Sequence, residues 1–273
     1  MQGLRNTVRE RYFTFLAIAL AWSWGFLFLA IMAQANGWEG LVAPCRLLAG
    51  VGPLLAAMVM LLLGPKEDRS DYLGRLTDVS KVRPKWLAFI LLIVPAITVS
   101  SIIIDMVAGG SGGRLEEGFS DALASPISFA GFLAFILFFG PVPEEMGWRG
   151  YGVWKAQLAH TPVATGTIIG MAWMVWHVPL FFIVGTYQEG LGFGTIESLE
   201  YLLMIFFQAL IMVWIFNNTS GSIPAAVLFH FMVNLVGEMV SLSGPSDMVM
   251  ATLWGILALT VLLRYRLEKV HPC

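Results

Sequence analysis

The chain has 273 residues, 58% of them hydrophobic and only 12% charged, and its formal net charge is −2. Soluble globular domains carry about twice that share of charge, so the composition excludes this class and predicts a polytopic membrane protein in a lipid bilayer. No basic tract indicates a nucleic-acid partner, and none is expected. The two cysteines, Cys45 and Cys273, are far apart and are expected to be free thiols.

Hydrophobic runs long enough to cross a bilayer recur along the whole chain. The first has about 20 residues, so we interpret it as a membrane span and not as a signal peptide. We predict an all-α fold, a polytopic membrane helical bundle in which residues 1–273 form a single integral membrane domain. About eight transmembrane helices are expected, at residues 13–33, 44–64, 86–107, 126–143, 162–184, 198–216, 222–241 and 248–264.

Basic residues indicate the orientation of these spans. If the N-terminus is inside, Arg46 and Arg114 fall on the outer side or within a span. The rest of the 16 lysines and arginines, among them Arg5, lie on the cytoplasmic side, as the positive-inside rule requires. An odd number of spans would place the basic segment with Arg266 and Lys269 outside. Both termini are therefore predicted to be cytoplasmic.

Two long connections separate the early spans. The cytoplasmic one, Pro65–Lys85, mixes acids and bases and is expected to be a solvated amphipathic segment. The outer one, Gly109–Pro126, is rich in glycine and is expected to be a mobile loop. Its acidic pair, Glu116 and Glu117, is predicted to be solvated and to have no chemical role.

The stretch FFGPVPEEMGWRGY, Phe138–Tyr151, places two adjacent carboxylates directly after an apolar run. A charge at the centre of a membrane helix costs at least about 2.5–3.5 kcal/mol, so acids at this depth indicate a functional site. A glycine and two prolines are expected to break the helix, with Pro143 as the first residue of a new segment. Glu144 and Glu145 would then lie beside unpaired backbone N–H groups. Arg149 follows Glu145 by four residues, the spacing of a helical ion pair, which would leave Glu144 free to react.

Three further polar side chains fall inside predicted spans. His177 lies in the fifth span, whereas His230 and Asn234 lie four residues apart in the seventh, on one face of a helix. Simpler explanations exist: intramembrane histidines often only hydrogen-bond between helices, and the glutamate–arginine pair can be a structural salt bridge. Trp173, one turn before His177, is expected to pack and not to react. The combination of an acid, two imidazoles and an amide nonetheless favours a reaction centre.

At these residues the chain resembles the CPBP family of intramembrane proteases, which includes the type II CAAX prenyl endopeptidases and bacteriocin-immunity relatives. The family carries Glu-Glu-x-x-x-Arg, aromatic-x-x-x-His and His-x-x-x-Asn/Asp motifs in that order. This sequence has Glu144-Glu145-Met-Gly-Trp-Arg149, Trp173-Met-Val-Trp-His177 and His230-Phe-Met-Val-Asn234. A tryptophan thus stands in the second motif where phenylalanine is usual. The resemblance covers about residues 130–240, which would be the catalytic core.

The resemblance implies an endopeptidase that hydrolyses a peptide bond of a membrane-associated peptide or protein, of prenylated CAAX or leader type. It also implies the plasma membrane of a prokaryote, with the active site facing the cytoplasm. By the same resemblance, Glu144 would be the general base, His177 would position the water, and His230 and Asn234 would form the oxyanion hole. The residues that would organise the site are Glu145 and Arg149.

Metal dependence is open at this point. Glu144, His177 and His230 could together form a two-histidine, one-carboxylate zinc site, and the family is often grouped with metalloproteases. The sequence has no HExxH motif, and these three ligands would come from three separate spans. Asn234 suits an oxyanion donor better than a zinc ligand. We therefore favour a glutamate mechanism without a cofactor, with zinc as the alternative.

Two other functions fit part of the pattern. Intramembrane Glu, His and Arg side chains form proton or ion relays in transporters, where helices broken by glycine and proline are common. No matching break in a second half of the sequence indicates an inverted repeat, which weighs against a transporter. A non-catalytic immunity or scaffold protein could also retain these helices.

Overall fold

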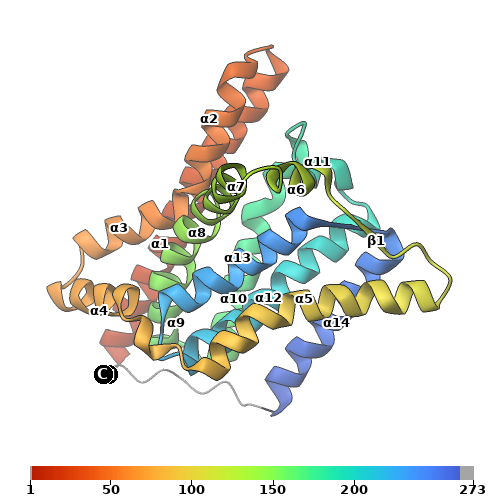
Figure 1. The fold of residues 1–273 in the computed structure, drawn as a ribbon. Helices are drawn as coiled ribbons and strands as arrows, with labels where there is room; N and C mark the ends of the chain where they lie inside the picture. Colours follow the sequence, from red (N-terminus) through yellow and green to blue (C-terminus); the bar gives the residue numbers. More distant parts are fainter. Residues whose placement is uncertain (1, 265–273) are drawn as a thin grey trace.

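The computed structural model describes residues 2–264, with side chains from Arg9 onward, and they form a bundle of helices (Figure 1). The side chain of Arg5, as well as Arg266, Lys269 and Cys273, lies outside this part. The elements are α1 (Gln2–Ala35), α2 (Glu39–Gly50), α3 (Gly52–Leu62), α4 (Lys66–Thr77), η1 (Val79–Lys81), α5 (Pro84–Val107), β1 (Gly113–Leu115), α6 (Glu117–Ala122), α7 (Pro126–Phe138), α8 (Pro141–Gly147), η2 (Trp148–Val153), α9 (Trp154–Ala159), α10 (Pro162–His177), η3 (Val178–Phe182), α11 (Tyr187–Leu191), α12 (Ile196–Asn218), α13 (Ile223–Met239), β2 (Val240–Leu242) and α14 (Gly244–Arg264).

The helices agree with the predicted membrane architecture. Six helical segments of the described chain are long and apolar enough to cross a membrane, and a seventh is the α2–α3 pair, bent by 44°. The remaining predicted span is α13, an apolar helix of 17 residues that is shorter than the others. The all-α membrane bundle is therefore confirmed, and each of the eight predicted spans corresponds to one of these segments.

Two span boundaries differ from the prediction. The fourth span does not end near residue 143 but continues through α8, η2 and α9 to Ala159, with a break after Phe138. The new segment begins at Pro141 and not at Pro143, because a proline at the first helical position loses no hydrogen bond and has a suitable fixed φ. The fifth span is shorter as an α-helix than predicted, since α10 ends at His177 and a 3-10 turn follows.

Both long connections are more ordered than predicted. The outer loop is not a mobile segment, because β1 pairs antiparallel with β2, Arg114 opposite Ser241. This pairing ties the loop after α5 to the C-terminal end of α13. The connection that was predicted to be cytoplasmic is not simply solvated either: it contains α4, in which Tyr72 and Arg75 are buried.

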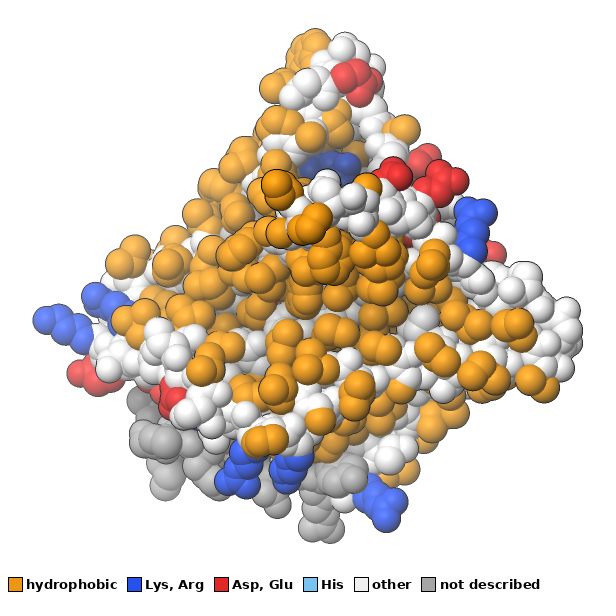
Figure 2. All heavy atoms as spheres, viewed as in Figure 1, with side chains coloured by type: hydrophobic (Ala, Val, Ile, Leu, Met, Phe, Trp, Pro, Cys, Tyr) orange, Lys and Arg blue, Asp and Glu red, His pale blue; other side chains and the backbone are white. Residues whose placement is uncertain are grey.

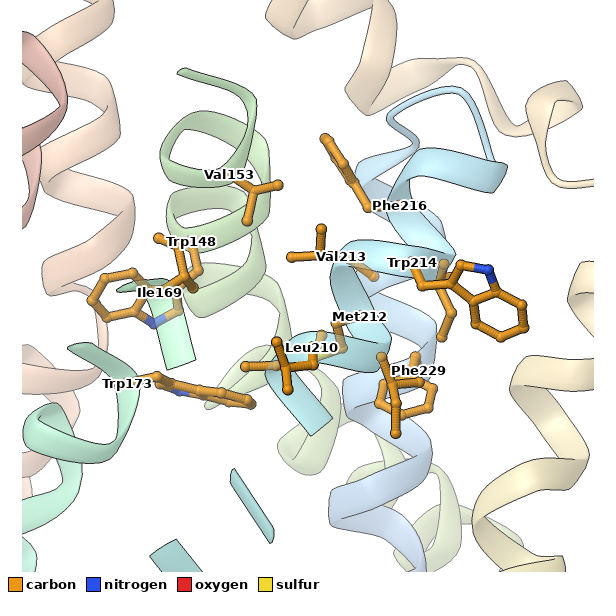
Figure 3. Close-up of a cluster of buried hydrophobic side chains, with 14 of the residues drawn as sticks. Trp148, Val153, Ile169, Trp173, Leu210, Met212, Val213, Trp214, Phe216 and Phe229 are labelled. Carbon is orange, nitrogen blue, oxygen red and sulfur yellow. The ribbon is translucent and has the colours of Figure 1, made fainter. Parts of the chain in front are cut away.

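The core surrounds α12, which packs between α10 and α14. Figure 3 shows side chains of this cluster, with Trp148 and Trp173 on one side and Phe229 on the other. Close contact between α10 and α12 depends on two glycines spaced by four residues. A Cβ on Gly166 or Gly170 would lie 2.9 Å from a side-chain atom of α12, and small residues at such crossings are how membrane helices gain packing energy.

The outer surface has the distribution of a membrane protein. Hydrophobic side chains cover most of the face in Figure 2. Lysines and arginines lie mainly near its lower and left edges, with others in the upper part and at the right. The lower left part of the molecule is where α4 lies in Figure 1. A broad apolar band with charges displaced to its rims fits a bilayer, which hydrates charges only at its two faces.

Candidate active site

The predicted pair of carboxylates lies inside the bundle, on the short helix α8. Gly140 is the N-cap of α8 and has non-helical backbone angles, so that a new helix starts after it and Glu144 falls in the first turn as predicted. Glu145, predicted for the same turn, lies one residue beyond it. Glu144 is 6% exposed, and Glu145 and Arg149 are fully buried. The helix then changes to a π-helix at Trp148–Val153. Such insertions are rare and are found frequently at functional sites.

Glu145 is the most heavily paired group of the site. Its Oε1 accepts a hydrogen bond of 2.8 Å from Arg149 Nη1 and lies 2.9 Å from His230 Nδ1. The predicted i, i+4 ion pair is thus present, and it is buried on both sides. Arg149 makes no other side-chain hydrogen bond among the described residues, although its guanidinium lies over the Trp173 ring, 4.6 Å from the centroid. Its charge is therefore compensated mainly by Glu145.

Trp173 connects the three sequence motifs, contrary to the prediction that it only packs. Its indole Nε1 donates a 2.8 Å hydrogen bond to Glu144 Oε2. Its ring lies edge-on to His177 and His230, at centroid distances of 5.8 and 5.1 Å. A phenylalanine could provide the ring contacts but not the N–H donor. Tryptophan, unlike phenylalanine, carries an N–H donor. This property of the residue at position 173 could have indicated from the sequence that it bonds to an acid of the site.

His177 has one ring nitrogen engaged and the other available. Its Nδ1 lies 2.7 Å from the carbonyl oxygen of Trp173, one turn earlier in α10. Because a carbonyl oxygen can only accept, Nδ1 carries the proton and Nε2 of the neutral ring is an acceptor. Such a nitrogen can hold a water molecule by accepting one of its hydrogens. Aromatic rings of Trp176 and Tyr201 flank the imidazole.

Asn234 and Glu144 face the same space next to the break in the helix. A Cβ placed on Gly140 would lie 3.1 Å from Asn234 Nδ2 and 3.9 Å from Glu144 Oε1. Glycine at position 140 therefore keeps open a small space between the amide and the unbonded carboxylate oxygen. The structure thus brings Glu144, His177 and His230, from α8, α10 and α13, around Trp173. Asn234 of α13 lies near Glu144, next to Gly140.

The residues considered above for zinc do not form a ready metal site. No three His, Cys, Asp or Glu side chains of the described residues lie close enough to hold one metal ion, and tetrahedral zinc needs three or four converging donors. Glu144 Oε2 accepts the indole N–H of Trp173, and His230 Nδ1 lies beside Glu145. The atoms left for an ion would be Glu144 Oε1 and the Nε2 atoms of His177 and His230. We derive no step through zinc.

Fold and site together define a helical membrane protein with an acid–imidazole centre buried in its bundle. Residues 126–236 match the family model described as Type II CAAX prenyl endopeptidase Rce1-like. A relative from Methanococcus maripaludis, CAAX prenyl protease 2, is 24% identical over 236 residues, which are 86% of this chain and 86% of that protein. These findings support the resemblance drawn from the three motifs, which is to the CAAX family of intramembrane proteases.

Proposed function

We propose that the protein is an intramembrane endopeptidase with Glu144 as general base. The free oxygen of Glu144 takes a proton from a water molecule that His177 Nε2 orients. The resulting hydroxide attacks the carbonyl carbon of the scissile peptide bond. Glu144, now protonated, gives its proton to the leaving nitrogen as the C–N bond breaks. General acid–base catalysis of this kind contributes about 10²–10⁴-fold to a rate.

In this proposal, His230 and Asn234 stabilise the oxyanion of the tetrahedral intermediate. The Asn234 amide is a donor in any protonation state, and it lies beside the free oxygen of Glu144. His230 directs Nδ1 at Glu145, so a second donor at Nε2 requires both ring nitrogens to be protonated. One buried donor of this type is worth roughly 3–4 kcal/mol in the transition state.

The observation that carries the proposal is the hydrogen bond between Trp173 and Glu144. It holds one carboxylate oxygen at 2.8 Å and leaves the other beside Asn234. A base must be oriented in this way to act on one substrate atom. Glu145 is not the proposed base, because it is fully buried and its Oε1 is shared by Arg149 and His230.

The comparisons support a proposal on the substrate class. The names of the family and of the relative contain the words CAAX prenyl. We therefore propose a prenylated C-a-a-X peptide as the substrate, in preference to a leader peptide. The bilayer would hold the prenyl chain while the peptide enters the site. Because basic side chains gather near the end where α4 lies, we propose that this end faces the cytoplasm of a prokaryotic cell, and the site with it.

The experiment is cleavage of a fluorogenic farnesylated C-a-a-X peptide by the purified protein in lipid nanodiscs. Glu144→Gln should lower kcat at least about 100-fold while the melting temperature stays near that of the wild type. Glu117→Gln, an exposed acid of the outer segment, is the matched control and should leave kcat unchanged. Wild-type turnover by Glu144→Gln would refute the proposed base.

A further inference from the structure

The helix α4 contacts the active-site segment through two buried polar side chains. The Tyr72 hydroxyl donates a 3.0 Å hydrogen bond to the carbonyl oxygen of Met146, in α8. Arg75 Nη1 donates a 2.9 Å hydrogen bond to the carbonyl oxygen of Gly150, in η2. Carbonyls within a regular helix are bonded inside it. Donors from another helix at both sides of the α8–η2 junction therefore indicate that α4 supports the change to π geometry.

Arg75 is held on several sides, which is unusual for a charged residue of a cytoplasmic connection. It is 3% exposed. Its Nε is 3.0 Å from Asp71, and its guanidinium lies 4.2 Å from the centroid of the Trp154 ring. Burying an arginine is costly unless every face of the group is compensated. A planar guanidinium can pair, stack and donate to a carbonyl at once, whereas a lysine ammonium cannot.

Glycines in the contacting segments allow this close approach. A Cβ on Gly150 would lie 2.9 Å from Tyr72 Cε2, and a Cβ on Gly221 would lie 2.9 Å from Arg75 Cδ. A third contact is ionic: Asp68 of α4 is 2.6 Å from Lys155 of α9. The helix α4 is thus attached before, within and after the π-helical segment.

The π-helical segment determines where Arg149 points. Glu145 lies in α8 and Arg149 in η2, so the junction between the two geometries separates the partners of the buried ion pair. Glu145 and Arg149 would also be neighbours at the i, i+4 spacing of a regular α-helix. Each residue of an α-helix turns it by roughly 100°, and the π geometry changes this angle. It therefore determines how the Arg149 guanidinium meets the Trp173 ring.

We propose that Tyr72 and Arg75 are positioning residues, which hold the π geometry of residues 148–153 and thereby set the Glu145–Arg149–Trp173 arrangement. Neither residue touches the substrate. Tyr72 remains a donor over the working pH range, because burial raises the pKa of its hydroxyl to about 12. The proposal rests on the proposed function only where turnover is the measured quantity.

The first test does not depend on catalysis. Proteins labelled with 5-fluorotryptophan are compared by fluorine NMR in nanodiscs, and the Trp173 resonance is assigned by its loss in Trp173→Phe. Tyr72→Phe, which keeps the ring, and Arg75→Lys, which keeps the charge, should each shift or broaden this resonance. Leu73→Ala, at a 56% exposed position of the same helix, should not. An unchanged Trp173 resonance in folded Tyr72→Phe and Arg75→Lys would overturn the proposal. If Arg75→Lys does not fold, Tyr72→Phe decides alone.

The second test is the split between kcat and KM in peptide cleavage. A positioning role lowers kcat by about 5- to 30-fold, as for loss of one hydrogen bond worth about 1–2 kcal/mol, with KM unchanged within about two-fold. A lower melting temperature with wild-type kcat would show that the two residues only stabilise the fold, and would overturn the proposal. If the wild type cleaves no peptide, the proposed function fails, whereas the fluorine spectra still decide the role of α4.

Discussion

The hydrogen bond from Trp173 to Glu144 can be removed with little other change by Trp173→Phe. The phenyl ring retains most contacts with the two histidines, but the N–H donor at 2.8 Å from Glu144 Oε2 is lost. A hydrogen bond to a charged acceptor is worth about 1.5–3 kcal/mol. At about 1.36 kcal/mol for each factor of ten, its loss should lower kcat by roughly 10- to 160-fold.

The assay is steady-state cleavage of the farnesylated peptide, with the melting temperature measured on the same samples. Trp176→Phe is the matched control. Trp176 is 5% exposed, close to the 3% of Trp173, and its Nε1 has no hydrogen-bond partner among the described residues. It should therefore keep kcat near that of the wild type. Equal losses in the two variants would show that ring volume and not the hydrogen bond matters, and an unaffected Trp173→Phe would refute the orienting role.

Four further predictions concern the support of the site. Arg149→Ala should lower both stability and turnover, by about 3–5 kcal/mol in unfolding free energy, because it leaves Glu145 charged and buried without its main partner; normal thermal stability would contradict the organising role. Gly150→Ala should lower the free energy of unfolding by about 1–3 kcal/mol, because the added Cβ would lie 2.9 Å from the Tyr72 ring. Gly74→Ala in α4 is its control: the added Cβ has open space around it, so this variant should raise the free energy of unfolding by up to about 1 kcal/mol. Thermal unfolding measures both changes. Prolonged chelation should leave cleavage unchanged, and activity lost on chelation and restored by zinc alone would contradict this. Burial raises the pKa of Tyr72 to about 12. The stabilising effect of the neutral hydroxyl is therefore complete below pH 10, the ordinary pKa of tyrosine being about 10, and it is lost as the pH rises to 12. The difference in melting temperature between the wild type and Tyr72→Phe should vanish in this interval.

The sequence pattern was sufficient to predict the buried acid on a new helix and its neighbouring ion pair. Proline and glycine before Glu144 restrict the backbone locally, and the i, i+4 spacing of Glu145 and Arg149 is a property of one helix. Such short-range features need no tertiary information. The first residue of the segment was wrong by two positions, because both Pro141 and Pro143 are compatible with a first helical turn.

The role of α4 could not be predicted in the same way. Its sequence KEDRSDYLGRLT has the composition of a solvated segment, and no periodic apolar pattern reveals that two of its side chains are buried. Tyr72 and Arg75 are buried because backbone carbonyls of α8 and η2 accept their hydrogen bonds. One of these carbonyls belongs to α8, and the other belongs to the π-helix η2, which the sequence pattern does not indicate. The outer sheet was missed for a similar reason, since β1 has a partner more than a hundred residues away in the chain.

The sequence by itself determined that the protein is a helical membrane bundle and which polar groups lie within it. Hydrophobicity and the cost of charge in lipid are properties of each segment alone, and therefore can be read from composition and spacing. Only the tertiary structure decided how Glu144, His177, His230 and Asn234 meet around Trp173, and which carboxylate stays free of an ion pair. Those relations depend on the packing of α8, α10 and α13, whose order along the chain does not specify their contacts.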